Sequence, residues 1–116
     1  MSSPALESRF VAFAIAVSRT AQSMPDDVAG RTLARQLARA GTAPAANYAE
    51  ARESLSARDY VFKMQSCLKE LRETMVWLRV AHGNGFRNAD YAELQRECSE
   101  LTAITVTCVK KAKARL

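Results

Sequence analysis

One segment of the chain reads Arg35-Gln-Leu-Ala-Arg-Ala-Gly-Thr-Ala-Pro-Ala-Ala-Asn-Tyr-Ala-Glu50 and keeps a helical repeat through residues that disfavour helix. The repeat has steps of three and four residues, at Leu33, Leu37, Ala40, Pro44, Asn47 and Ala51. Pro44 cannot bond the Ala40 carbonyl, which costs about 3 kcal/mol in a regular helix. Because the repeat resumes after the proline, we expect a helix that is kinked near Gly41-Pro44 and does not end there. On the inner face, Asn47 should be buried and bonded to nearby backbone, so Pro44 and Asn47 are interpreted as structural residues.

Three other segments also have helical periodicity. Ser3-Pro4 is a typical helix start, and the apolar repeat that follows should end before Pro25. Asp26 or Asp27 should cap the helix that holds the quoted segment. Ser56 with Asp59 resembles a capping box and opens a helix predicted over 57–82, with Gly83 as its left-handed C-cap. The apolar seam of this helix is Val61, Met64, Leu68, Leu71, Met75, Leu78 and His82.

The last predicted helix follows an Asn84-Gly85 turn, and Asn88 is a plausible cap for it. Its heptad is Tyr91, Leu94, Cys98, Leu101, Thr105, Cys108 and Ala112. Four amphipathic helices with short connections, and no strand pattern, predict an all-α fold: an antiparallel up-down four-helix bundle. The length of 116 residues, with 48% hydrophobic and 25% charged residues, fits a single bundle domain over residues 1–116.

The sequence contains no recognisable catalytic or metal-binding motif. His82 is the only histidine, which excludes a His-pair metal site, and the glutamates are interpreted as partners of Arg and Lys. The three cysteines have no C-x-x-C spacing, so we expect reduced, buried thiols and a cytoplasmic protein. The apolar run over residues 10–17 is too short to span a bilayer, which takes about 20 residues. We therefore expect no enzyme activity, no cofactor, no metal and no membrane partner.

Positive charge is unevenly distributed over the chain, whose net charge is +5. Ten cations are candidates for binding nucleic-acid phosphates: Arg31, Arg35 and Arg39, then Arg58, Arg72 and Arg79, then Lys110, Lys111, Lys113 and Arg115. The first three form a stripe opposite the leucines of the quoted segment. The alternative is that these cations pair with glutamates or remain solvated.

Four apolar residues of the predicted 57–82 helix, Phe62, Val76, Trp77 and Val80, lie outside its seam. The first predicted helix also has a second apolar flank, at Val11 and Ile15. A monomeric bundle has no need of so much apolar surface, so these four residues are candidates for a self-association interface. The alternative is that the first helix covers them within the monomer.

Three segments together resemble a known family: Leu37-Ala-Arg-Ala-Gly-Thr-Ala-Pro-Ala-Ala-Asn-Tyr-Ala-Glu50, Ser56-Ala-Arg-Asp-Tyr60, and Leu68-Lys-Glu-Leu-Arg-Glu-Thr74 with Trp77-Leu78. They are similar to the bacterial four-helix bundle proteins called 23S rRNA intervening-sequence proteins, over residues 6 to 110. Ala51 replaces the usual glycine after the glutamate, and Tyr48 replaces the usual isoleucine. The resemblance implies a small cytosolic bundle that forms a homopentamer and has no established enzymatic activity. It also implies similarity to the accessory protein of diversity-generating retroelements, with RNA, DNA and a reverse transcriptase as possible partners.

We therefore expect a non-enzymatic homo-oligomeric bundle that binds nucleic acid through its basic surface. The alternative is a structural or protein-interaction module that binds no nucleic acid.

Overall fold

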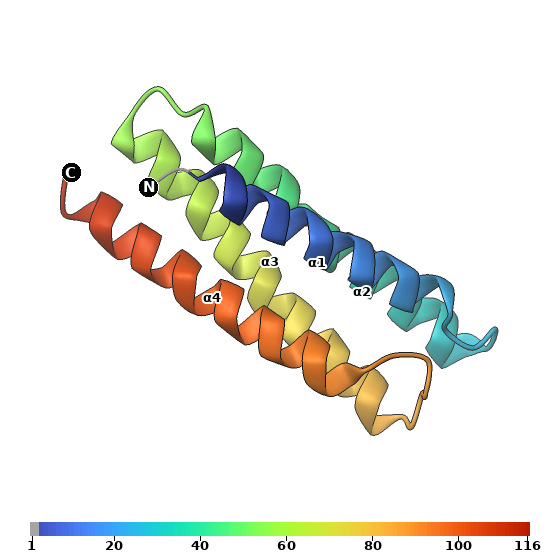
Figure 1. Cartoon of the computed structure of the whole chain (residues 1–116). Helices are drawn as coiled ribbons and strands as arrows, with labels where there is room; N and C mark the ends of the chain where they lie inside the picture. Colours follow the sequence, from blue (N-terminus) through green and yellow to red (C-terminus); the bar gives the residue numbers. More distant parts are fainter. Residues whose placement is uncertain (1–2) are drawn as a thin grey trace.

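The computed structural model describes residues 3–116, which form four α-helices running side by side (Figure 1). They are α1 (Pro4–Gln22), α2 (Val28–Arg52), α3 (Ala57–Gly83) and α4 (Tyr91–Lys113). Successive helices pack together, and α4 returns to α1 through a less extensive contact. The start of α1, the α2–α3 connection and the end of α4 share one end of the bundle, which measures 47 × 21 × 20 Å. The predicted all-α antiparallel four-helix bundle is confirmed.

Side-chain caps fix where the first three helices begin. The Ser3 hydroxyl accepts a hydrogen bond from the Leu6 N–H, satisfying one of the amides that a helix start leaves without a partner. Asp27 and Ser56 cap α2 and α3 in the same way. All three caps agree with the sequence prediction. Each bond joins residues only three apart, so the local sequence is enough to predict it.

Asp90 caps α4, so the predicted cap at Asn88 is wrong. The Asn88 side chain instead donates to the Thr20 carbonyl at 2.8 Å and accepts from the Tyr91 hydroxyl at 2.6 Å. These bonds join the α3–α4 connection to the end of α1. Asn88 is therefore used for a tertiary contact, and the next acidic residue before the helix takes the capping position.

The left-handed residue after α3 is Gly85, with φ of 77°, and not the predicted Gly83. Gly83 is the last helical residue, and Asn84 is the C-cap with right-handed backbone angles. The helix therefore extends one residue further than predicted before glycine reverses the chain.

Helix α2 is continuous from Val28 to Arg52 and passes through a buried Pro44. The prediction that the helix would not end at Gly41-Pro44 is confirmed. The Thr42 hydroxyl donates to the Ala38 carbonyl at 2.7 Å, a local bond that keeps this polar side chain satisfied on the helix surface.

Beyond Pro44 the buried residue is Tyr48, and the predicted burial of Asn47 is wrong. Asn47 is half-buried, and its side chain makes no hydrogen bond within residues 3–116. Tyr48 is fully buried: its ring lies 5.1 Å from that of Phe10, and its hydroxyl accepts a bond from the Ser3 N–H at 3.0 Å. A helix period of 3.6 residues permits a step of three or four after Pro44, and burying the aromatic ring is more favourable than burying an amide.

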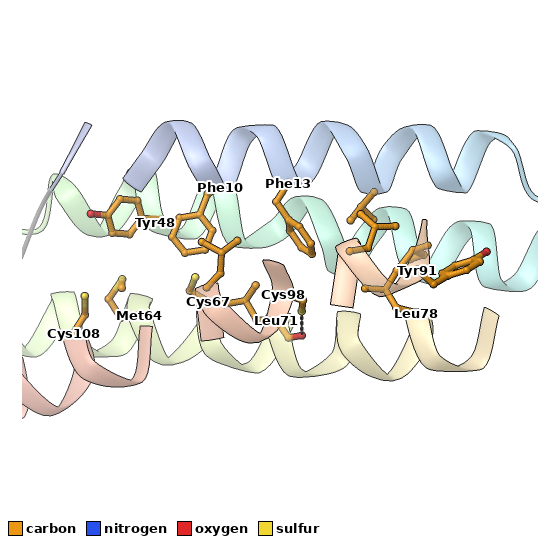
Figure 2. Close-up of a cluster of buried hydrophobic side chains, with 14 of the residues drawn as sticks. Phe10, Phe13, Tyr48, Met64, Cys67, Leu71, Leu78, Tyr91, Cys98 and Cys108 are labelled. Atoms are coloured by element: carbon orange, nitrogen blue, oxygen red, sulfur yellow. Dashed lines mark hydrogen bonds between the residues drawn. The ribbon is translucent and has the colours of Figure 1, made fainter. Parts of the chain in front are cut away.

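Side chains from all four helices form one apolar core (Figure 2). Every residue of the predicted α4 heptad is buried: Tyr91, Leu94, Cys98, Leu101, Thr105, Cys108 and Ala112. In α3 the seam is partly wrong, because Cys67, Thr74 and Ala81 are buried in place of Leu68, Met75 and His82. Helix α3 packs against both α2 and α4, so its buried strip is rotated by about one residue from the predicted seam.

Two buried polar side chains on this face of α3 have partners, one within the helix and one on α2. The Thr74 hydroxyl donates to the Glu70 carbonyl at 2.7 Å, and Cys67 Sγ lies 3.7 Å from the Pro44 carbonyl oxygen. A threonine can therefore occupy a core position that the sequence pattern assigned to a larger apolar residue. None of the four described helices has the length and apolar run needed to cross a membrane.

Candidate nucleic-acid interface

The three arginines of the predicted α2 stripe are all exposed. Arg31 forms an ion pair with Asp26 at 2.9 Å, and Arg39 pairs with Glu73 and lies 3.5 Å from Glu70 Oε1. No ion pair within residues 3–116 involves Arg35. The stripe therefore points outward as predicted, but two of its three charges are already engaged by carboxylates.

Arg58, Arg72 and Arg79 are exposed on α3 and form no ion pair with any described residue. Arg72 and Arg79 line a groove of about 420 Å³ between α3 and α4. The rest of its lining is apolar or neutral and consists of Met75, Val76, Ser99, Thr102 and Ala103. Arg72 and Arg79 line the same groove, whereas Arg58 lies about four turns before Arg72 in the helix.

The basic run Lys110, Lys111, Lys113 and Arg115 lies at the end of α4, and all four side chains are exposed. None of them forms an ion pair within the described chain. Cations here also face the negative end of the helix dipole, which stabilises the helix itself. This cluster and the Arg72/Arg79 groove lie on different parts of the bundle surface.

Three of the four predicted interface residues form an outward strip on α3. Phe62 is 67% exposed, Val76 49% and Val80 38%. Their spacings of 14 and 4 residues place them on one face of the helix. Trp77 differs, because it packs partly against the core and its Nε1 donates to Glu73 Oε2 at 3.1 Å. The hydrogen bond from Trp77 is the main cause of a lowered pKa of Glu73, and the Arg39 guanidinium lowers that pKa further.

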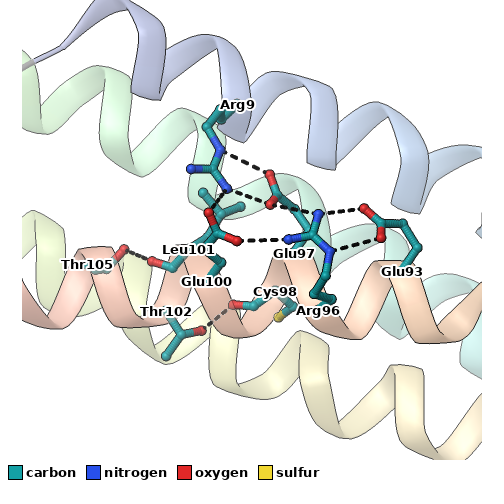
Figure 3. A network of polar contacts seen from close by, with 9 residues as sticks. All are labelled: Arg9, Glu93, Arg96, Glu97, Cys98, Glu100, Leu101, Thr102 and Thr105. Atoms are coloured by element: carbon teal, nitrogen blue, oxygen red, sulfur yellow. Dashed lines mark hydrogen bonds and ion pairs between the residues drawn. The ribbon is translucent and has the colours of Figure 1, made fainter.

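Helices α1 and α4 are linked by an ion-pair network that the sequence pattern did not indicate (Figure 3). Arg9 of α1 bonds Glu97 at 2.6 Å and Glu100 at 3.0 Å, and Arg96 bonds Glu93 at 2.6 Å and Glu100 at 2.8 Å. The Glu97 bond raises the pKa of Arg9, and the Arg96 bond lowers the pKa of Glu93. The Glu93–Arg96 pair spans three residues and agrees with the predicted pairing of glutamates with Arg and Lys. Arg9 lies 88 residues from Glu97, and no local signal connects them.

Comparisons with known proteins agree with this architecture. The family model described as 23S rRNA-intervening sequence protein matches residues 8–107. The chain belongs to the 23S rRNA-intervening sequence protein family. Similarity also extends to a crystal structure of a protein with unknown function from the S23 ribosomal protein family of Bacteroides thetaiotaomicron, with 21% identity and a TM-score of 0.81. That match covers 90% of this chain and 98% of the other, and it shows the shared fold. The comparison with curated proteins found no match.

The three cysteines and His82 of this 23S rRNA-intervening sequence protein make packing contacts. Cys67, Cys98 and Cys108 are unpaired and buried, as predicted. Burial raises the pKa of Cys67 to about 12 and that of Cys98 to about 11, so neither thiol is a ready nucleophile. His82 is exposed and stacks on Tyr91 with ring centres 5.4 Å apart. No group of three or more His, Cys, Asp or Glu side chains within residues 3–116 could hold a metal ion.

Proposed function

We propose that this 23S rRNA-intervening sequence protein is a non-enzymatic, cytoplasmic homo-oligomer that binds RNA or DNA through its basic surface. The observation that carries the proposal is the pair Arg72 and Arg79, two exposed and unpaired cations on the sides of one groove. Guanidinium groups form bidentate bonds with phosphates, and such contacts need no base-specific motif. Arg35 and Arg58 add unpaired charge, whereas Arg31 and Arg39 contribute less because their guanidinium groups are engaged.

The proposal is tested by fluorescence anisotropy with labelled RNA and DNA over a salt series. Affinity should fall steeply as salt rises, because phosphate contacts release counterions. The double variant R72E/R79E should weaken binding by about tenfold or more, which is the expected loss of two charge-assisted contacts.

A matched control is R19E/R87E. Arg19 and Arg87 are also exposed and have no ion-pair partner among the described residues, but neither lines the groove. The control changes net charge by the same amount. If both double variants weaken binding equally, attraction is a property of net charge and the groove has no special role. Absence of binding at low salt would contradict nucleic-acid binding altogether.

Self-association is proposed through the strip of Phe62, Val76 and Val80, which borders the Arg72/Arg79 groove because Val76 also lines it. Exposed apolar side chains on one helix face lose unfavourable contact with water when a second copy covers them. The family resemblance implies a pentamer, so light scattering should give about five times the chain mass of 12.8 kDa. V76E should lower that mass, whereas V28E should not, because Val28 is 76% exposed at the start of α2 and lies outside the strip.

The second candidate function is a structural or protein-interaction module without nucleic-acid binding. The same strip favours it, because Phe62, Val76 and Val80 could contact a different protein. A reverse transcriptase is the partner class that the family resemblance suggests. An unchanged oligomer in V76E, together with no binding of RNA or DNA by the parent protein, would favour this candidate.

A further inference from the structure

A cavity of about 420 Å³ is lined by residues near the α2–α3 connection and by residues at the end of α4. These two segments share one end of the bundle (Figure 1). Its polar lining consists of Arg52, Ser54, Tyr60, Lys111 and Arg115, and three alanines complete the wall. This volume falls within the range of pockets that hold small ligands. The cavity is distant from the Arg72/Arg79 groove, so it requires a separate explanation.

The charged residues that line this cavity are all basic. Arg52, Lys111 and Arg115 line it, and none of its lining residues is acidic. Lys111 lies in the last turn of α4 and Arg115 just beyond its C-cap, Ala114, and neither forms an ion pair within residues 3–116. Arg52 bonds Glu7 at 2.8 Å, which helps to hold the guanidinium in position, although Glu7 itself is not part of the lining. Cations brought together in this way repel one another, and a bound anion would remove the repulsion.

Two neutral groups at the cavity also suit an anion. The Ser54 hydroxyl oxygen is buried and has no hydrogen-bond partner among the described residues, although buried hydroxyls are normally bonded. Ala57, the first residue of α3, lines the cavity, so the positive end of this helix dipole lies beside it. Ser54 Oγ is closed to solvent in this structure, so the hydroxyl can donate to a ligand oxygen once its side chain rotates toward the cavity. The start of α3 adds positive potential.

We propose that this cavity binds a terminal phosphate monoester, carried either by a free nucleotide or by the end of a nucleic acid. A monoester carries up to two negative charges and three exposed oxygen atoms, which matches the two cations without an ion pair, Lys111 and Arg115, beside Arg52. An internal phosphodiester carries one charge and is substituted on two sides, so it matches this set less well. The ring of Tyr60 in the lining supplies an apolar face for the attached nucleoside. If the phosphate is carried by the end of a nucleic acid, the inference rests on the proposed function. If it is carried by a free nucleotide, the inference does not depend on that function.

The test is isothermal titration calorimetry of the full chain with adenosine 5′-monophosphate, inorganic phosphate and adenosine. The two phosphate-containing ligands should bind and adenosine should not. K111A/R115A should weaken nucleotide binding by about tenfold or more, since two charge-assisted bonds are lost. S54A should weaken it by a smaller factor without lowering the melting temperature, because the variant removes a hydroxyl that has no partner in the structure.

The matched control is K110A/K113A, which removes the same charge from the same end of α4 at residues that do not line the cavity. This variant should bind the nucleotide within about threefold of the parent protein, since screened charges contribute little at that distance. No heat of binding with the phosphate-containing ligands, or an equal loss in the two double variants, would overturn the proposal. Circular dichroism of each variant checks that it remains folded.

A second arm identifies the source of the phosphate. Two oligonucleotides of one sequence, labelled at the 3′ end, carry either a 5′-phosphate or a 5′-hydroxyl. Tighter binding of the 5′-phosphate form, lost in K111A/R115A, assigns the cavity to nucleic-acid ends. Equal binding of the two forms, together with nucleotide binding by calorimetry, assigns it to free nucleotides. Failure of the proposed function would give a different result. The 5′-hydroxyl oligonucleotide would then show no binding that R72E/R79E reduces, whatever calorimetry shows for the nucleotide.

Discussion

Gly41 of α2 lies directly against Val17 of α1: a Cβ atom built on Gly41 would come within 2.3 Å of Val17 Cγ1 and 2.9 Å of Val17 Cβ. Nonbonded carbon atoms do not come that close, so α1 and α2 could not keep their present separation with any larger residue at position 41. Val17 is itself fully buried. The glycine therefore sets the spacing of α1 and α2 next to Pro44, and the small residues of this segment permit the close approach.

We predict that G41A destabilises the protein. Alanine improves helix propensity by about 1 kcal/mol, but overpacking a close helix contact costs about 1–3 kcal/mol. The net loss should be about 1 kcal/mol, measured as the free energy of unfolding in urea. The double variant V17A/G41A should unfold at a higher urea concentration than V17A alone, because the new methyl group then has space. G83A is the control: nothing lies within 4 Å of a Cβ there, so it should not destabilise.

Tyr48 and Asn47 should respond very differently to truncation. Y48A removes a fully buried ring and should cost about 3–5 kcal/mol of unfolding free energy. N47A removes a half-buried amide that makes no hydrogen bond within the described chain, so the change should stay within about 0.5 kcal/mol. Urea denaturation of both variants checks which of these two adjacent residues faces the core. A larger loss in N47A than in Y48A would contradict the structure of α2 beyond Pro44.

The Arg9–Glu97 pair should contribute measurably to closing α1 on α4. Its side chains are 36% and 21% exposed, so solvent screens the interaction only in part. A double-mutant cycle with R9A and E97A should give a coupling of about 0.5–1 kcal/mol at low salt, decreasing as salt rises. The Arg96–Glu93 pair within α4 is more exposed and should show a weaker coupling. A salt-independent Arg9–Glu97 coupling would argue against an ion-pair origin.

The buried thiols should resist modification in the native protein. With the pKa of Cys98 raised to about 11, only about one thiol in a thousand is ionised at pH 8. Because all three thiols are buried, Ellman's reagent should react with none of them until the protein unfolds, and with all three in guanidinium chloride. Rapid reaction of the native protein would show that the core opens far more often than its packing indicates.

Stability should also fall at alkaline pH. The folded protein holds the Cys98 proton more tightly than the unfolded chain, because burial raises the thiol pKa from 9.0 to about 11. This contribution is complete below pH 9 and is lost as pH rises toward 11, when the unfolded chain alone releases the proton. Urea midpoints at pH 8 and pH 10 should differ less in C98S than in the parent protein. In C98S the serine hydroxyl can still donate to the Leu71 carbonyl, which Cys98 Sγ approaches at 3.3 Å.

The sequence by itself determined the features that depend on local bonds and a regular repeat. The caps at Ser3, Asp27 and Ser56 use bonds across three residues, and the α4 heptad keeps one period over its whole length. The number of helices, their order and the bundle fold followed from these signals. The exposure of the ten candidate cations was also predictable, because the opposite face of each helix is apolar.

Only the tertiary structure decided which of two adjacent residues is buried and which distant side chains meet. A period of 3.6 residues does not distinguish Asn47 from Tyr48, and the position of Phe10 on α1 resolves the choice. Arg9 reaches Glu97 across 88 residues, and the cavity at Lys111 forms where two segments far apart in sequence meet. Local patterns cannot encode such contacts, because their energies depend on how four helices rotate and pack together.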